Sequence, residues 1–336
     1  MQNGETKLVL PPAQSIDASV VIVSYNTRDV TCRCVQSVLA SCDATVQVIV
    51  VDNCSSDGSA MELRARFPQI TVIDSPANGG FAFGNNIGFE HAVGRYVLVL
   101  NPDAEVEPDT IARARDYCDA RPEVGVMGCR VRFEDGTRQS SIFRYLSLRQ
   151  LLGILLMSSA AARRSRLFGD LRYSRLDLDQ ENDVDSVTGC FMFVRRAMLA
   201  QVGGMDQRFF MYGEESEWCR RITRAGWKVR YNPALQIMHV GGASTDGMSA
   251  WKAVEITRGH ILFLRFTRGA FIAWVGTLLM VLRDLRGAPW RLAKELLVAR
   301  AAERNERLAW RARLHFVVRA LFRLPMGQSI SRTNHP

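Results

Sequence analysis

The chain has 336 residues, enough for one large α/β domain with an appendage or for two domains, and its 47% hydrophobic content predicts a normal buried core. The net charge of +9 is uneven, because residues 283–323 hold eleven Lys and Arg against four Asp and Glu, a net of +7. Zinc-finger spacing and the aromatic–glycine interleaving of an RNA-binding sheet are absent. A nucleic-acid partner is therefore not expected, and an anionic membrane surface is the better partner for the basic segment.

The first half of the chain alternates between predicted strands and helices. Residues 1–18 are polar, lack the apolar run of a secretory signal, and are expected to be extended or disordered. Strands are predicted at 19–24, 46–51, 70–73, 96–100 and 124–129, and helices at 29–40, 57–67, 83–92 and 110–120. This alternation implies βαβ units and a mainly parallel sheet, in which ligands bind outside the carboxyl ends of the strands. Asp52 and Asp103 both lie at such ends.

The pattern is less clear between residues 130 and 185. Leu146–Ala162 is apolar and is followed by three arginines, so it is a lid helix, a wall of an acceptor site or a membrane-touching segment. Strand patterns return at 187–194, 228–231 and 236–239. All eight cysteines fall between Cys32 and Cys219 without a C-x-x-C pair, which predicts buried free thiols in a reducing cytosol.

The C-terminal part differs from the rest of the chain. Gly269–Leu282 has fourteen residues without a charge, fewer than the roughly 20 that span a bilayer. We expect a re-entrant or interfacial helix there. Pro289–Arg323 interleaves apolar residues with arginines and predicts a basic amphipathic helix lying on a membrane. The alternative is a soluble helical subdomain packed on the sheet.

An acidic helix is predicted to follow Gly213 and to end at Gly226. Glu215 shares one helical face with Trp218, Cys219 and Ile222, so it is expected to point inward. A partly buried carboxylate tends to have a raised pKa and can act as a general base. The alternative is an acidic residue that stabilises the helix N-terminus. The same spacing predicts that a second group of charged residues is solvated, namely Glu214, Glu217, Arg221 and Arg224.

Two further features are candidates for a nucleotide site. The familiar phosphate loop and the G-x-G-x-x-G motif are both missing, but residues 78–86 (NGGFAFGNN) form a glycine-rich stretch that is either a ligand contact or a tight turn. Asp103 at a strand end, with Glu105 two residues later, suits Mg²⁺ or Mn²⁺ held against a diphosphate, although Pro102 and Pro108 also fit a plain turn. A lone His such as His239 is more often structural than a ligand.

Together these motifs resemble the inverting glycosyltransferases of family 2, which have the GT-A fold, and in particular the rhamnosyltransferase-like branch of bacterial surface-polysaccharide synthesis. The resemblance covers residues 19–246. It rests on seven stretches in order: VIVSYN at 21–26, VVDNCSSDG at 50–58, NGGFAFGNN at 78–86, LNPD at 100–103, TGCFM at 188–192, the Glu214–Glu215 pair, and HVGGAS at 239–244.

The resemblance implies roles for individual residues. Glu215 is the catalytic base, with Glu214 as a possible substitute, and Asp103 with His239 lies at the divalent cation, Mg²⁺ or Mn²⁺. Two departures are visible: the metal motif reads Asn101-Pro102-Asp103 and so lacks one acidic ligand, and the base is Glu where Asp is usual. The implied donor-binding residues are Ser24, Tyr25, Asn26, Asp52, Asn53, Asn78, Gly79, Phe83, Asn86 and Asn101.

The expected fold class is therefore α/β, with a GT-A catalytic domain at 19–250 and a membrane-associating helical appendage at 251–336. Residues 19–129 are expected to bind the nucleotide-sugar, and 130–250 the acceptor. The implied reaction moves L-rhamnose from dTDP-L-rhamnose to a glycan or a polyprenyl-diphosphate-linked sugar. The implied location is the cytoplasm, peripheral on the inner face of the cell membrane. The alternative is a non-catalytic sugar-nucleotide-binding protein or membrane adaptor with a degenerate transferase fold.

Overall fold

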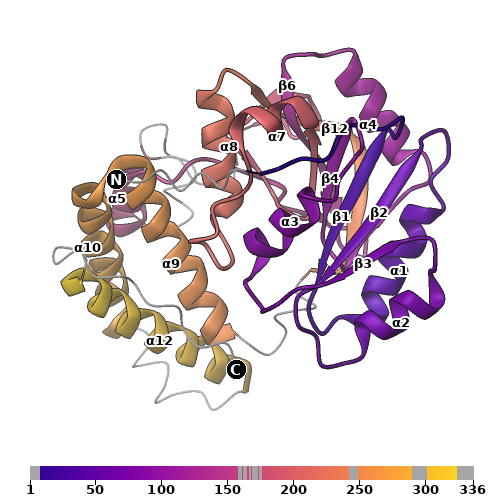
Figure 1. Ribbon diagram of the computed structural model, residues 1–336. Helices are drawn as coiled ribbons and strands as arrows, with labels where there is room; N and C mark the ends of the chain where they lie inside the picture. The colour runs from indigo at the N-terminus through magenta and orange to yellow at the C-terminus, as the bar shows by residue number, and fades with distance from the viewer. Residues whose placement is uncertain are drawn as a thin grey trace. The chain divides into compact units, whose positions relative to one another are not determined.

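The computed structural model describes residues 8–157, 161, 165, 168, 173, 176–241, 249–289 and 301–323. The chain forms two compact units, which we call the sheet unit and the helical unit (Figure 1). The sheet unit consists of Met1–Phe143, Asp177–Phe210 and Glu214–Ser244, and the helical unit of Arg144–Leu176, Met211–Gly213 and Thr245–Pro336. The segment 144–176 thus groups with the C-terminal helices, a grouping that the sequence pattern does not indicate.

The sheet unit is built on one large mixed sheet with the strand order β3-β2-β1-β4-β11-β6-β12-β5. The strands are β1 (Ala18–Ser24), β2 (Val46–Asp52), β3 (Thr71–Asp74), β4 (Tyr96–Leu100), β5 (Ala104–Val106), β6 (Val124–Arg132), β11 (Phe191–Arg195) and β12 (Lys228–His239). Strands β3, β2, β1 and β4 run parallel, as do β6 and β12, while β11 lies antiparallel between β4 and β6. The predicted α/β, mainly parallel architecture is confirmed.

Short strands extend this sheet. β7 (Arg138–Gln139) pairs with β6, and β9 (Asn182–Asp183) pairs with β12. β8 (Ile142–Phe143) and β10 (Ser186–Val187) form a separate two-stranded sheet. The strand predicted at 187–194 is thus two strands, β10 and β11, with a turn between them. The strands predicted at 228–231 and 236–239 are one strand, β12, whose register shifts between Asn232 and Gln236.

Helices cover both faces of the sheet because the β-branched strands are apolar on both sides. The helices of this unit are α1 (Arg28–Leu39), α2 (Ser59–Arg66), α3 (Phe81–Phe89), α4 (Thr110–Asp119), α7 (Arg196–Val202) and α8 (Glu214–Arg224). Val20 and Ile22 of β1 join the core that includes α1, whereas Val21 and Val23 face α3. α3 approaches closely because it has glycines there: a Cβ at Gly88 would lie 2.2 Å from Val21 Cγ1. Figure 1 shows α1 and α3 on opposite sides of β1.

The helical unit contains α5 (Leu148–Leu156), α9 (Ser249–Arg268), α10 (Ala270–Arg286) and α12 (Ala301–Arg323). α10 contacts the other three helices. α5 begins with a capping box in which Ser147 and Gln150 satisfy each other's backbone N–H groups. Part of the predicted apolar stretch 146–162 and part of the predicted helix 289–323 lie outside the described residues. Where the structure describes the chain, no helix combines the length and the hydropathy of a membrane span.

The eight cysteines are free thiols. Six are buried, as expected, but Cys42 and Cys54 are exposed, which corrects the prediction for these two. Cys42 lies in the loop after α1 and Cys54 in the loop after β2, and such loops run over the surface because their backbone groups need water or side-chain partners.

Candidate active site

The predicted site residues gather at the carboxyl ends of neighbouring strands. Ser24 of β1 is in register with Asp52 of β2, and Ile22 with Leu100 at the end of β4. Further along the strand order, His239 at the end of β12 pairs with Ala104 of β5. Asp103 directly precedes Ala104. Strands far apart in sequence therefore deliver their polar ends to one edge of the sheet, where α/β proteins bind ligands.

The loops after β1 and β2 are locked together. Asn26, which has a positive φ of 51°, donates its backbone N–H to Ser55 Oγ and accepts from the backbone N–H of Ser56 at 2.7 Å. Ser24 is fully buried and its hydroxyl bonds to those of Thr27 and Thr31. Ser24 thus stabilises the loop through buried hydrogen bonds. Asn26 is exposed and Tyr25 is partly buried, so these two side chains lie nearer the protein surface.

Asp52 and Asn53 combine fixed and unused hydrogen-bonding groups. Asp52 Oδ2 accepts from the backbone N–H of Ser55, and Asn53 Nδ2 donates to Asn78 Oδ1 at 2.9 Å. Both residues are at most 5% exposed. Within the described part of the chain, Oδ1 of Asp52 and Oδ1 of Asn53 have no donor. Buried acceptors without a donor are costly, so these two oxygens are suited to receive a ligand N–H or O–H.

The glycine-rich stretch joins the donor loops to the segment before α8. Gly80 has φ +85°, and a Cβ there would lie 2.0 Å from the carbonyl oxygen of Phe210. That same oxygen accepts from the backbone N–H of Phe81 at 2.8 Å. Only glycine fits this backbone contact. Gly79 is buried beneath the partly buried Phe83 ring, since a Cβ at Gly79 would clash with that side chain.

Asn86 has a different use from the one that the resemblance implies. Its side chain donates to the carbonyl oxygen of Met205 at 2.8 Å and accepts from the Met205 N–H at 2.9 Å. It is 2% exposed. Because both ends of the amide hold the Met205 backbone, Asn86 ties α3 to the loop that precedes α8, and we do not place it among the donor contacts.

Asp103, His239 and Asn101 form a compact polar cluster at the end of β4. His239 Nε2 lies 3.1 Å from Asp103 Oδ1 and 3.1 Å from Asn101 Nδ2. The other carboxylate oxygen, Asp103 Oδ2, accepts from the backbone N–H of Gly241. His239 Nδ1 lies 2.6 Å from Gln139 Oε1 on β7. Gly242–Ser244, the end of the predicted His239 motif, lie outside the described residues.

The donor set of this cluster suits a hard divalent cation shared with a diphosphate. One buried carboxylate oxygen and one imidazole nitrogen lie 3.1 Å apart, beside the Asn101 amide. In the described residues no group of three or more His, Cys, Asp and Glu side chains gathers for metal binding. Mg²⁺ and Mn²⁺ sites of one or two protein ligands are completed by substrate phosphates and water. The residues present therefore fit such an ion, with ligands missing that a substrate supplies.

The acidic helix α8 corrects one prediction from the helical spacing. Glu214 and Glu217 are buried, 3% and 7% exposed, although we expected both to be solvated. Arg221 is also largely covered, since its guanidinium donates to Glu217 and to the Val202 and Gly204 carbonyls. The loop after α7 covers this second face of the helix, which the spacing of one helix cannot show. Burial raises the pKa of Glu217, and Arg221 offsets part of that rise.

Glu215 is partly buried, as expected, and its neighbour Glu214 is more deeply buried, at 3% exposed. Cys190, in the turn before β11, interacts electrostatically with Glu215. Burial raises the pKa of the Cys190 thiol to about 12, and the carboxylates of Asp103 and Glu215 both add to the increase. Cys190 also accepts, through its carbonyl oxygen, the backbone N–H of Asn101. One buried residue thus has Asp103 and Glu215 as charged neighbours.

Sequence reasoning missed two members of the site. Gln139, which holds His239, falls in the stretch where the secondary-structure pattern is unclear, and no motif marks it. Cys190 lies within the TGCFM stretch, but nothing in that stretch shows that it lies between two carboxylates. Glu105, considered beside Asp103, pairs instead with Arg33 at 3.2 Å.

Comparisons with known proteins found a matching family model, several relatives and solved structures with a similar fold. The family model described as "Glycosyl transferase family 2" matches residues 19–203. The chain is 28% identical over 242 residues to an N-acetylglucosaminyl-diphospho-decaprenol L-rhamnosyltransferase of Mycobacterium tuberculosis, covering 67% of this chain and 76% of the relative. It is 25% identical over 229 residues to the rhamnosyltransferase WbbL of Escherichia coli, covering 66% and 82%. Among solved structures, the mannosyltransferase PcManGT of Pyrobaculum calidifontis, in complex with GDP-Man and Mn²⁺, shares the fold, with a TM-score of 0.52, 15% identity and coverage of 96% and 92%.

Proposed function

Because the chain belongs to glycosyl transferase family 2 and is a glycosyltransferase of polysaccharide synthesis, we propose that it transfers L-rhamnose from dTDP-L-rhamnose to a hydroxyl of a lipid-linked glycan. The proposal places this reaction at the cytoplasmic face of the membrane. Two relatives are named rhamnosyltransferases, and one of these names specifies a decaprenol-linked acceptor. The observation that carries the proposal is the Asp103–His239 pair at the carboxyl end of β4, beside Cys190, which also has Glu215 as a charged neighbour.

The donor nucleoside binds at the loops after β1, β2 and β3 in this proposal. The unused Oδ1 atoms of Asp52 and Asn53 are buried acceptors at that edge. Thymine carries an imide N–H and its deoxyribose a hydroxyl, and either group can donate to them. Tyr25, Asn26, Asn78, Gly79 and Phe83 line the same loops and complete the proposed nucleoside site, with Asn101 nearest the diphosphate.

The reaction is a single displacement. Glu215 accepts the proton of the acceptor hydroxyl while that oxygen attacks the anomeric carbon of the sugar. The bond from that carbon to the nucleoside diphosphate breaks on the opposite side, so the anomeric configuration inverts once. Asp103 and His239 would hold a divalent cation, Mg²⁺ or Mn²⁺, which would neutralise charge on the diphosphate. Asn101 orients His239 through its amide.

The test compares the two neighbouring glutamates. Glu215→Gln keeps the shape and removes the basicity, so turnover falls by roughly 10²-fold or more while donor affinity is kept. Glu214→Gln is the matched control and costs much less. The measurements are rhamnosyl transfer to a polyprenyl-diphosphate-linked acceptor and donor affinity by calorimetry. If Glu214→Gln is the more damaging change, the base is Glu214. If neither change lowers transfer, the proposed chemistry is wrong.

A further inference from the structure

The outward face of α10 is apolar along its whole length. Phe271, Val275, Leu278, Leu282 and Leu285 follow one another at spacings of four or three residues, which places them on one side of a helix. We call them the α10 stripe. Phe271 is 73% exposed, Leu282 42% and Leu285 49%, and the other two are partly exposed. A helix of an isolated soluble unit normally places polar residues on this side.

The inward face of the same helix includes small and polar residues. Its buried residues include Ala273, Gly276, Thr277 and Asp284. Asp284 is fully buried, and both its oxygens accept from the Arg313 guanidinium of α12, at 2.9 and 2.8 Å. The only acidic residue of α10 is thus used to hold the helices together, and the outward side of the helix has no negative charge.

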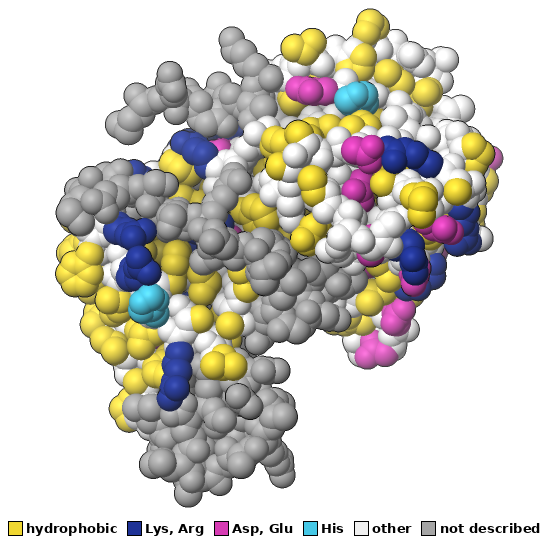
Figure 2. Space-filling model, turned by 60° about the horizontal axis from the view of Figure 1, so that its bottom comes forward, with side chains coloured by type: hydrophobic (Ala, Val, Ile, Leu, Met, Phe, Trp, Pro, Cys, Tyr) yellow, Lys and Arg dark blue, Asp and Glu magenta, His cyan; other side chains and the backbone are white. Residues whose placement is uncertain are grey.

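Where side chains of the helical unit are described, its surface charge is of one sign. The acidic residues among them are Glu255 and Asp284, 1% and 0% exposed. The exposed charged residues are all arginines: Arg144, Arg149, Arg268, Arg286, Arg311 and Arg319. Figure 2 shows yellow apolar side chains beside dark blue Lys and Arg side chains on the helical unit, at the left of the view.

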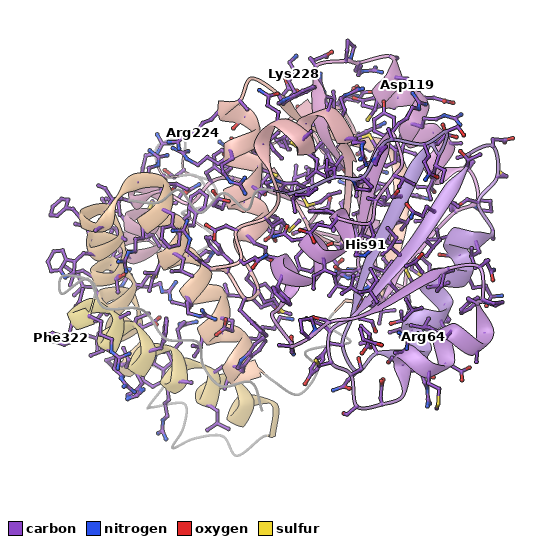
Figure 3. The ribbon with its side chains drawn as sticks, viewed as in Figure 1. Arg64, His91, Asp119, Arg224, Lys228 and Phe322 are labelled. Carbon is purple, nitrogen blue, oxygen red and sulfur yellow. The ribbon has the colours of Figure 1, made fainter. Side chains whose placement is uncertain are left out.

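The helices beside α10 continue this surface. Leu152 and Leu156 of α5 are 37% and 59% exposed, and Arg286 of α10 donates to the carbonyl oxygen of Leu155. On α12, the exposed residues Leu308, Arg311, Arg319 and Phe322 follow one another at spacings that place them on one side of the helix. Figure 3 shows Phe322 pointing away from the helices at the edge of the unit. Large apolar side chains among exposed arginines suit the interface of an anionic bilayer.

We propose that the α10 stripe is the membrane-docking surface of the protein and that its partner is an anionic lipid bilayer. The stripe lies in the headgroup region while the surrounding arginines contact lipid phosphates. The proposal rests on the proposed function, since it supplies the surface on which a lipid-linked acceptor is reached. It develops the expectation of an interfacial helix at residues 269–282, and it assigns the main apolar contact to α10 and not to residues 289–323.

The test measures co-sedimentation of the full chain with vesicles of phosphatidylethanolamine and phosphatidylglycerol, and with phosphatidylcholine vesicles for comparison. Leu282→Glu combined with Leu285→Glu places two charges in the stripe. Its partitioning onto the anionic vesicles falls by about tenfold or more, because charge opposes both the apolar and the electrostatic contribution. Phe271→Glu, at the most exposed position, gives the same direction without threatening the fold. Met61→Glu is the matched control, because Met61 is apolar, 74% exposed and on α2 of the sheet unit.

Three results would overturn the proposal. The first is that the stripe variants partition like the wild type, and the second is that the wild type does not bind anionic vesicles at low salt. The third is a wild-type dimer, seen by light scattering without lipid, that the stripe variants dissociate, since the stripe then contacts a second copy. Vesicle binding needs no donor, so its failure leaves the proposed reaction untouched. Conversely, loss of transfer in Glu215→Gln with normal vesicle binding concerns only the reaction.

Discussion

Gln139 holds His239 from the side opposite Asp103: Nδ1 of the imidazole lies 2.6 Å from Oε1 of the amide. The Nδ1 proton is therefore directed at Gln139, and Nε2 points at the Asp103 carboxylate and the Asn101 amide. Groups that fix the second nitrogen of a ligating imidazole set its tautomer and its direction. The position of Gln139 makes it a positioning residue for the proposed cation site.

Replacing Gln139 tests that role. Gln139→Leu removes the acceptor, so the concentration of Mn²⁺ needed for half-saturation with nucleoside diphosphate rises by roughly tenfold or more. Gln139→Glu keeps an acceptor for the Nδ1 proton and retains tighter binding than Gln139→Leu. Calorimetric titration with Mn²⁺ and dTDP measures both variants without turnover. Equal Mn²⁺ affinity of wild type and Gln139→Leu would show that Gln139 has only a packing role.

Asp103 is the carboxylate on which the cation site depends. Asp103→Ala weakens donor binding and removes its dependence on divalent cation, because the remaining imidazole and amide are weak ligands for Mg²⁺. Glu105→Gln is the control, since the Glu105 carboxylate pairs with Arg33 instead of facing the cluster. Donor affinity is measured with Mn²⁺ and with EDTA. Full wild-type transfer in EDTA would contradict the metal role.

Gly259 of α9 supports the turn that leads into α8. A Cβ at Gly259 would lie 1.9 Å from the carbonyl oxygen of Tyr212, and Tyr212 and Gly213 both have positive φ directly before Glu214. Gly259→Ala displaces that turn, so the turnover number falls by roughly 10²-fold, as expected for a catalytic group moved by about 1 Å. The donor KM is unchanged.

The control for this change is Gly276→Ala on α10. There a Cβ would meet the flexible end of the Leu264 side chain instead of backbone. Gly276→Ala is expected to lower the melting temperature of the protein and to leave the turnover number of the folded enzyme near the wild-type value. Wild-type turnover in Gly259→Ala would show that the turn before α8 does not depend on this contact.

Asp17, directly before β1, accepts hydrogen bonds from Thr45 and Arg95 at the amino-terminal ends of the strands. Burial raises its pKa, but hydrogen bonds from Thr45, Arg95 and Arg115 outweigh that effect and lower the pKa from its ordinary 3.8 to about 2. A lowered folded-state pKa stabilises the fold above the unfolded pKa. This stability is lost as the pH falls from about 4 towards 2.

At pH 7, Asp17→Asn is expected to lower the free energy of unfolding by about 1–2 kcal/mol, after allowance for solvent screening. Urea unfolding measures this difference, which disappears at pH 2. The control, Asp29→Asn, removes a carboxylate that is 79% exposed beside Arg28 and changes stability by less than about 0.5 kcal/mol. A pH-independent cost for Asp17→Asn would show that packing, not charge, sets the contribution of this residue.

The sequence by itself determined the βα alternation of the first 130 residues and the order of the motifs. Strands β1, β2 and β4 are rich in apolar residues, and polar residues follow each of them, so the strand ends and Asp52 and Asp103 could be located without a structure. The same local signals located α8, and the family resemblance was confirmed. These features are predictable because they depend on neighbours in sequence: hydrophobic periodicity, turn residues and short motifs.

Only the tertiary structure decided which polar groups meet and which surfaces stay exposed. The spacing of α8 could not show that Arg221 is held by the Gly204 carbonyl in the loop after α7. Nor does any pattern around the two-residue strand β7 indicate that Gln139 contacts His239. The apolar stretch of α10 is visible in the sequence, but its exposure is not. It depends on Asp284 turning inward to Arg313, a contact between residues 29 positions apart. Burial is set by what other elements cover, and a helix or strand read alone carries no information about its neighbours.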